Sequence, residues 1–213
     1  MTQAAYMQPV IDAFHKGPVV LGPWASHAYR SDPRHFMMVL SRYKFVAKML
    51  RGKKRVLEVG CGDGYGAPIV LQEVGELVGV DYEREAIDAA HAERAQFFVH
   101  DITEEPVPGV FDAAYSLDVL EHLEGSQTFM DNICASLCRD GVLIIGTPNA
   151  TAAQYGSPLS QAGHINLQSA DSLRDLMAER FKNVFSFSMN DEVVHTGYSA
   201  MAHYLFCIGV GRK

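Results

Sequence analysis

The sequence predicts an α/β fold built on a doubly wound, mostly parallel sheet of about seven strands. The first observation is a set of short apolar segments with the composition of buried strands, at 55–59, 77–81, 96–100, 111–116 and 142–147. The second is that segments with helical spacing of apolar residues lie between several of them, at 84–91 and 128–137. Such alternation is typical of parallel strands that are covered by helices on both faces.

The third observation concerns the C-terminal part of the chain. A helix is predicted at 172–179, and two further strands follow at 183–189 and 203–210. No apolar stripe of helical length lies between these two strands, so we expect them to pair antiparallel. In an open α/β sheet of this kind, the ligand binds outside the carboxyl ends of the strands.

The first 52 residues differ from the rest of the chain. Residues 1–32 are interrupted by Pro and Gly and contain Trp24, the one tryptophan. A helix is predicted after Pro33 because apolar residues recur at helical spacing, namely Phe36, Leu40, Tyr43, Ala47 and Leu50. We expect residues 1–52 to form a helical lid over a core at 53–213, within a single domain at 1–213. Tyr43 lies on the apolar stripe of that helix, so Arg30, which has less apolar context, is the better lid candidate, and which Arg or Tyr of this segment binds the cofactor stays open.

Composition excludes several classes of protein. The 213 residues are 48% hydrophobic and 20% charged, which is typical of a globular domain. The net charge of −7 argues against a nucleic-acid partner. The four cysteines form no Cys-x-x-Cys pair and are expected to be free thiols in a reducing compartment. With no apolar run long enough to span a membrane and no secretory signal, we expect a cytoplasmic protein without a membrane partner. Whether it forms a homodimer stays open.

One motif carries the chemistry. The strand at 55–59 runs directly into a glycine-rich turn, Glu58-x-Gly60-x-Gly62-x-Gly64. Glycines there permit positive φ and let the backbone approach a ligand closely. The next strand ends at Asp81, whose carboxylate can accept hydrogen bonds from both hydroxyls of a ribose. Together these two strand ends predict a nucleoside site.

The kind of nucleoside depends on three more features. Gly62, Gly64 and Ala67 satisfy a dinucleotide fingerprint, which is weak evidence by itself. However, an acidic residue, Glu58, lies two positions before the first glycine. The third strand ends in Asp101-Ile102, which can bind an adenine amino group and pack on its ring. The fourth strand ends in a polar run that begins at Asp118.

From Val56 to Asn149, these motifs resemble the class I S-adenosylmethionine-dependent methyltransferases, which have a Rossmann-like fold. The resemblance implies S-adenosylmethionine as cofactor and S-adenosylhomocysteine as product. It places the methionine part of the cofactor at the glycine turn, the ribose at Asp81, the adenine at Asp101 with Ile102, and the sulfonium beside Asp118. The implied cofactor-binding residues are Glu58, Gly60, Cys61, Gly62, Asp63, Gly64, Asp81, Tyr82, Asp101, Ile102 and Asp118.

Histidines near the expected reactive end are candidates for catalysis. His122 lies four residues after Asp118 and suits a general base, although it could instead cap or pack against the cofactor. His164 and His195 lie in two polar segments expected over the same site and are the other catalytic candidates. Each of them alone fits a hydrogen-bonded loop histidine better, and it is their expected convergence on one face that favours a catalytic role. Tyr29, Asn149 and Asp191 are expected to bind the acceptor.

The same resemblance narrows the acceptor. Enzymes of this class that methylate exocyclic amines of bases carry Asp/Asn-Pro-Pro-Tyr after the fourth strand, where this chain has Leu117-Asp118-Val119-Leu120. We therefore expect a small-molecule acceptor, methylated on a hydroxyl oxygen because histidines surround the site. The chain is similar to bacterial methyltransferases of surface-polysaccharide or related pathways. The alternatives are an NAD-dependent oxidoreductase and a non-catalytic protein that binds S-adenosylmethionine.

A divalent metal ion is a further possible cofactor. Asp118, Asn149 and His164 could supply ligands, and some class I enzymes that methylate small molecules use magnesium. Those enzymes carry an adjacent Asp-Asn pair after the fifth strand, whereas here Pro148 precedes Asn149. The sequence therefore predicts no metal.

Overall fold

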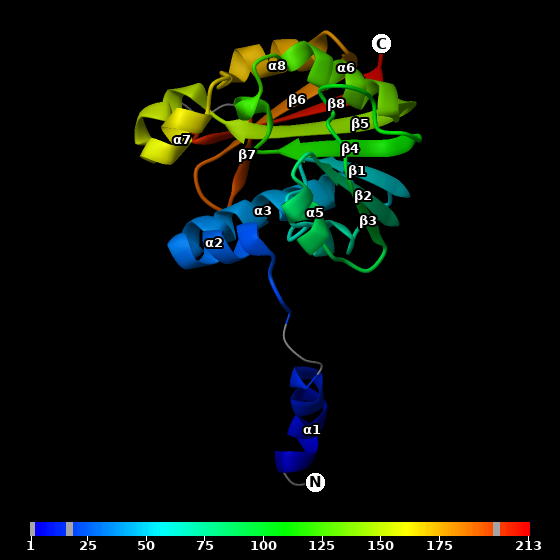
Figure 1. The fold of residues 1–213 in the computed structure, drawn as a ribbon, viewed down its shortest axis with the longest axis vertical. Coiled ribbons are helices and arrows are strands. Elements are labelled where there is room, and N and C mark those ends of the chain that lie inside the picture. The colour runs from blue at the N-terminus through cyan, green and yellow to red at the C-terminus, as the bar shows by residue number, and fades with distance from the viewer. Residues whose placement is uncertain (1–2, 16–18, 198–200) are drawn as a thin grey trace.

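The computed structural model describes residues 3–15, 19–197 and 201–213, and its centre is one eight-stranded sheet (Figure 1). The strand order is β3-β2-β1-β4-β5-β8-β6-β7. Strands β1 to β5 are parallel, and β8 pairs antiparallel with both β5 and β6. The strands are β1 (Arg55–Val59), β2 (Glu76–Asp81), β3 (Ala95–Val99), β4 (Phe111–Leu117), β5 (Leu137–Pro148), β6 (Phe181–Met189), β7 (Val194–Thr196) and β8 (Tyr204–Arg212).

This architecture confirms the predicted fold, with two differences in the strands. The sheet has an additional edge strand, β7, inside the segment that was expected to be a polar loop. Strand β5 begins at Leu137, five residues before the predicted start, because the preceding helix α6 (Ser126–Ser136) ends one residue earlier. Both differences arise from pairing with a neighbouring strand, which local apolar spacing does not encode.

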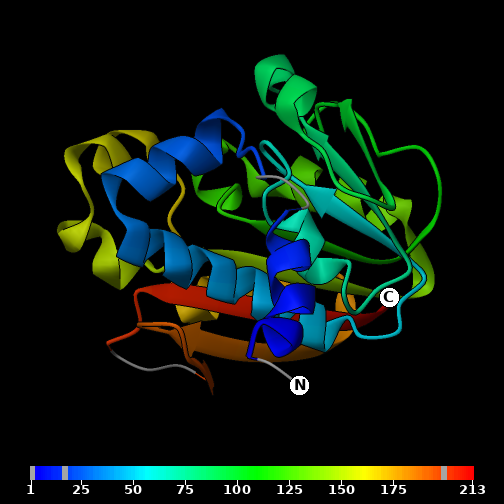
Figure 2. The ribbon, with the colours of Figure 1, turned by 90° about the horizontal axis from the view of Figure 1, so that it is seen from below.

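Helices cover both faces of the sheet. On one face lie α6 and α8 (Ala170–Ala178), and on the other lie α3 (Pro33–Met49), α4 (Ala67–Val70) and α5 (Arg84–Ala89) (Figures 1 and 2). Helix α3 begins where predicted, because the Asp32 carboxylate accepts hydrogen bonds from two backbone N–H groups of its first turn. Helix α8 begins with a reciprocal capping box between Ser169 and Ser172.

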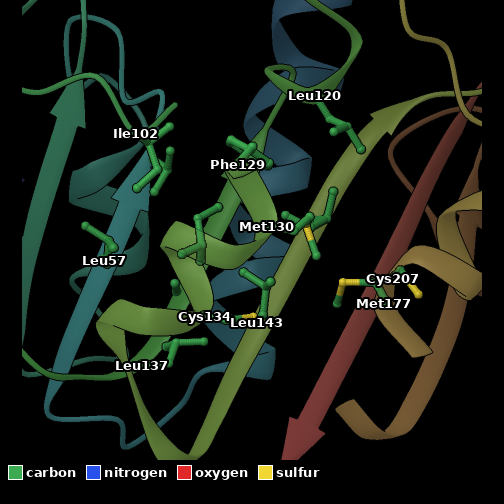
Figure 3. Close-up of a cluster of buried hydrophobic side chains, with 14 of the residues drawn as sticks. Leu57, Ile102, Leu120, Phe129, Met130, Cys134, Leu137, Leu143, Met177 and Cys207 are labelled. Carbon is green, nitrogen blue, oxygen red and sulfur yellow. The ribbon is translucent and has the colours of Figure 1, made fainter. Parts of the chain in front are cut away.

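The core is split between the two faces. Under α6, the side chains of Phe129, Met130 and Cys134 pack toward Leu57 of β1 and Leu143 of β5 (Figure 3). A second cluster lies under α3, where Tyr43, Val46 and Leu50 pack on the opposite face of the same strands. Burial on both faces explains why β1 and β4 read as nearly continuous apolar segments. The carboxyl ends of these buried strands are thereby held in fixed positions.

The N-terminal helices have different environments. Helix α1 (Gln3–Phe14) lies apart from the sheet, and its side chains from Tyr6 onward are exposed (Figure 1). Helix α2 (Pro23–Ser31) packs beside α3 and reaches the glycine turn, because Ala25 N donates to Asp63 Oδ2 at 3.0 Å. That α2 forms part of a lid over the site remains a prediction. Among the described residues, no helix has both the length and the apolar character needed to cross a membrane.

Candidate functional site

The glycine turn after β1 has the backbone that its sequence predicts. Gly60, Gly62 and Gly64 have φ values of +77°, +53° and +72°. A Cβ atom on Gly60 would lie 2.1 Å from Val119 Cγ2, so the packing against the end of β4 excludes any side chain. A Cβ atom on Gly62 would meet nothing within 4 Å. The turn therefore keeps a cradle in front of Gly62 that a side chain would fill.

Asp81 joins the end of β2 to this turn. Its Oδ2 accepts a hydrogen bond from Gly62 N at 2.8 Å, and its Oδ1 accepts one from Glu83 N at 3.0 Å. Each carboxylate oxygen has a second lone pair, so the half-buried group can still accept from a ribose. Tyr82 follows it with 69% of its surface exposed, at the place expected for a residue beside the cofactor.

The two adenine candidates after β3 have unlike surroundings. Asp101 is exposed, and its Oδ1 accepts from the backbone N and the hydroxyl of Thr103. Ile102 is 6% exposed, and its side chain belongs to the core cluster under α6 (Figure 3). Little of Ile102 is therefore available to a ring, and its contact with adenine remains a prediction.

Polar groups are buried beneath the turn. Glu58 is 2% exposed, its Oε2 has no hydrogen-bond partner, and burial raises its pKa to about 8, although the Tyr115 and Tyr43 hydroxyls favour the ionised form. Burial also raises the pKa of the Cys61 thiol. Asp63 Oδ1 is buried without a partner.

An ion pair lies at the carboxyl end of β4, where the sulfonium of the cofactor is expected. Arg42 Nη1 of α3 donates to Asp118 Oδ1 and Oδ2 at 2.7 Å each. The guanidinium carbon lies 3.8 Å from the centre of the Tyr204 ring on β8. Asp118 is one of two described non-glycine residues with positive φ, at 57°, which aims its carboxylate back at α3. Arg42 Nε is buried without a hydrogen-bond partner. Arg30, by contrast, donates to the backbone of its own helix.

Two of the three predicted catalytic histidines lie together. His122 ends η1 (Leu120–His122), and His164 follows α7 (Pro158–Gly163). Their ring centres are 5.0 Å apart, and Gly163 O lies 2.9 Å from His122 Nδ1. His164 is half-buried, and burial lowers its pKa, as does the neighbouring His122 to a lesser degree. The two imidazoles are therefore neighbours, and their role in catalysis remains a prediction.

Glu121 was missed as a site residue. It lies beside His122 but is 1% exposed, and burial raises its pKa to about 8. Its Oε2 accepts from the Thr147 hydroxyl at 2.9 Å, whereas Oε1 has no partner. One ligand atom of Glu121 lies within 4.8 Å of a ring nitrogen of each histidine. The sequence did contain a signal for Glu121: it is an acidic residue directly before the candidate base His122, in a segment that is otherwise mostly apolar.

The other predicted acceptor residues do not join this cluster. His195 lies on β7, four strands from β4 in the sheet, or roughly 19 Å at normal strand spacing. Asp191 accepts from Val193 N within its own turn. Asn149 is buried, where it caps η2 (Ala150–Tyr155) and donates to Ala202 O at 2.8 Å. Tyr29 is exposed and contacts Phe36 edge to face. Their roles in the acceptor site remain predictions.

Comparison with known proteins identifies the class. A family model described as "Methyltransferase domain" matches residues 29–181, and the chain belongs to this family. A probable S-adenosylmethionine-dependent methyltransferase of Mycobacterium tuberculosis is 29% identical over 129 residues, which are 58% of this chain and 47% of that protein. This chain therefore spans about half the length of that relative. A ubiquinone biosynthesis O-methyltransferase of Actinobacillus pleuropneumoniae is 26% identical over 162 residues, 70% of this chain and 68% of that protein.

Solved structures agree on the fold. The N-methyltransferase NodS of Bradyrhizobium japonicum, in complex with S-adenosylhomocysteine, superposes with a TM-score of 0.62 at 20% identity, covering 84% of this chain and 86% of that chain. A possible histamine N-methyltransferase of Thermotoga maritima gives a TM-score of 0.69 at 16% identity, covering 88% and 98%. The fold is thus that of a class I methyltransferase, and S-adenosylmethionine is its cofactor. The cradle at Gly62 and the Asp81 carboxylate fit that cofactor.

Proposed function

We propose that the protein transfers the methyl group of S-adenosylmethionine to a hydroxyl oxygen of a small-molecule acceptor. The observation that carries this proposal is the pair of imidazoles, His122 and His164, beside the Asp118–Arg42 ion pair at the carboxyl end of β4. A hydroxyl must lose its proton as its oxygen gains a methyl group, and a neutral imidazole can accept that proton. The relatives named as O-methyltransferases support an oxygen acceptor.

The residues of this chain divide the work. When bound, S-adenosylmethionine supplies a methyl group on a positively charged sulfur, which needs little further activation. The glycine turn and Asp81 hold it in place, and the Arg42–Asp118 pair lies at the end of β4, where we place its amino-acid part. His122 orients the acceptor hydroxyl and receives its proton, so that the oxygen attacks as the O–H bond breaks. Alignment of the two reactants accounts for most of the acceleration.

A small molecule fits the chain better than a nucleic acid. The net charge is −7, and the four cysteines are free thiols, as the sequence predicted. We accordingly propose a cytoplasmic reaction without a nucleic-acid or membrane partner. Neither the NAD-dependent oxidoreductase nor the non-catalytic binding protein is favoured, because the family match is to methyltransferase domains.

The test is a methyl-transfer assay with matched acceptors. Purified protein is incubated with S-adenosylmethionine and pairs of small molecules that differ only in a hydroxyl or an amine, and S-adenosylhomocysteine and methylated product are measured by mass spectrometry. We expect methyl ethers. Methylamines from the amine member, with the hydroxyl member inert, would contradict the oxygen assignment.

Two aspartates provide the matched control for this assay. Asp81→Ala removes the carboxylate at the cofactor end of the sheet and should abolish turnover. Asp112 accepts from Lys54 N and Arg55 N at the opposite end of β4, so Asp112→Ala removes a similar pair of backbone hydrogen bonds away from the site. Asp112→Ala should retain turnover at temperatures where it remains folded.

A further inference from the structure

Three neighbouring side chains at the candidate site offer atoms that can bind a metal ion. One carboxylate oxygen of Glu121 and one ring nitrogen each of His122 and His164 all lie within 4.8 Å of one another. Bonds of about 2.1 Å to a common ion allow ligand atoms up to about 4.2 Å apart, so a small movement closes the set.

Hydrogen bonds to Glu121 and His122 leave one ligand atom of each side chain without a partner. Gly163 O can only accept a hydrogen bond, so His122 Nδ1 carries the hydrogen and leaves the lone pair on Nε2. Thr147 holds Glu121 Oε2, which leaves the buried Oε1 as the atom without a partner. Metal-binding histidines and carboxylates typically have such additional hydrogen bonds.

The two segments that supply the ligands are also fixed to each other. Asn166 N donates to Glu121 O at 3.0 Å, and Asn166 Nδ2 donates to Leu120 O at 3.2 Å. In the described part of the chain, no lysine or arginine forms an ion pair with Glu121. A buried carboxylate with one unpartnered oxygen is costly unless a cation or a proton joins it.

From this geometry we propose that Glu121, His122 and His164 bind one divalent transition-metal ion. Two imidazoles and one carboxylate suit Zn²⁺, Co²⁺, Mn²⁺ or Fe²⁺, whereas Mg²⁺ prefers a set of oxygen ligands. Three protein ligands leave coordination positions for the acceptor. This proposal replaces the sequence expectation of no metal, which was based on the different set Asp118, Asn149 and His164.

The ion would act on the acceptor, so this inference rests on the proposed function. A hydroxyl bound to a divalent cation is more acidic, and its proton passes to bulk water. The oxygen remains on the ion as an alkoxide and then forms its bond to the methyl carbon as the carbon–sulfur bond breaks. With the ion bound, His122 and His164 are ligands, and the coordinated alkoxide takes the place of a free imidazole base.

Binding is tested without reference to turnover. Full-length protein is stripped with a chelator, dialysed against Zn²⁺, Mn²⁺, Co²⁺ or Mg²⁺, and analysed for bound metal; Co²⁺ is also followed by its visible absorption. We expect one Zn²⁺ or Co²⁺ per chain and little Mg²⁺. Glu121→Gln and the double variant His122→Ala/His164→Ala should each weaken Zn²⁺ and Co²⁺ binding at least about 100-fold, more than the 10–100-fold typical of losing a supporting hydrogen bond.

The control is His91→Ala, which removes an exposed histidine outside the site and should bind metal as the parent does. A melting curve with S-adenosylhomocysteine shows whether each variant is folded. Absence of stoichiometric binding in the parent, or unchanged binding in the folded variants, would overturn the metal site. If stripped protein still methylates hydroxyls at the full rate, the metal proposal fails and the imidazole base stands. If the metal binds but no hydroxyl is methylated, the proposed function fails and the metal site stands.

Discussion

Arg42 and Asp118 form an ion pair across 76 positions of sequence, with Arg42 Nη1 at 2.7 Å from both carboxylate oxygens. The pair joins α3 to the carboxyl end of β4 and so fixes α3 beside the candidate site. The two side chains are 10% and 33% exposed. Charge pairs shielded to this degree are costly to break, because the remaining partner loses its counter-ion in a poorly solvated position.

Arg42→Ala should therefore destabilise the protein by roughly 2–4 kcal/mol, below the full cost for a deeply buried pair because Asp118 is partly exposed. The measurement is urea denaturation of the ligand-free protein. The control is Arg174→Ala, which removes an exposed arginine paired to Asp175 and should cause no resolvable change. Equal losses of unfolding free energy in the two variants would show that the buried Arg42–Asp118 pair stabilises the protein no more than an exposed pair does.

Glu58 makes stability depend on pH. Its pKa in the folded protein is raised to about 8, chiefly by burial, from an ordinary value near 4.5. Between these values the folded protein holds a proton on Glu58 that the unfolded chain releases, so the contribution of Glu58 to stability is fully present below about pH 4.5 and is lost as the pH rises toward 8. The slope is at most about 1.4 kcal/mol per pH unit for this one proton.

Glu58→Gln should flatten that decline, because the amide does not titrate. The free energy of unfolding of both proteins is measured between pH 5 and pH 8.5. Glu121 contributes a decline of the same sign, so some slope remains in the variant. If unfolding free energy falls with pH equally steeply in Glu58→Gln and in the parent, then the pKa of Glu58 is not raised in the folded protein.

Two glycines of the turn should respond differently to the same substitution. Gly62→Ala costs only the strain of positive φ, about 1–2 kcal/mol, because its Cβ meets no atom within 4 Å. That Cβ fills the cradle, so binding of S-adenosylhomocysteine should be lost. Gly60→Ala adds a 2.1 Å clash with Val119 to the same strain, giving roughly 2–5 kcal/mol.

Melting curves with and without ligand separate these effects. At about 100 times its Kd, S-adenosylhomocysteine adds about 2.7 kcal/mol and raises the Tm of a protein of this size by about 5–11 °C. We expect that shift in the parent and none in Gly62→Ala, whose ligand-free Tm falls less than that of Gly60→Ala. A full ligand shift in Gly62→Ala would place the cofactor elsewhere.

Alanine substitutions of the three candidate histidines should lower kcat to different degrees, according to where each ring lies. His122→Ala and His164→Ala should each lower kcat about 10²–10⁴-fold with little change in S-adenosylhomocysteine affinity, because both rings lie at the reactive end. His195→Ala should have a much smaller effect, since His195 is on the edge strand β7. Kinetics with a hydroxyl acceptor and calorimetry with the product supply the two readouts. An effect of His195→Ala as large as that of His122→Ala would require β7 to approach the site during turnover.

Local sequence determined most of the fold. The apolar strand segments, the glycine turn after β1 and the aspartate that ends β2 all depend on residues close together in the chain, and their structure follows the prediction. Backbone conformation at Gly60 and Gly62 is set by the absence of a Cβ atom, which can be read directly from residue type. The cofactor half of the site is of this kind.

Tertiary structure alone decided the acceptor half. His122 and His164 come together because η1 and the turn after α7 meet across 41 positions, whereas His195 lies four strands from β4. Burial likewise separates Glu121, which faces Thr147 with one oxygen unpartnered, from its exposed neighbour His122. Spacing along the chain encodes which residues share a helix or strand face. The distance between two loops depends on strand order and packing, which bring distant segments together only once the whole core has formed.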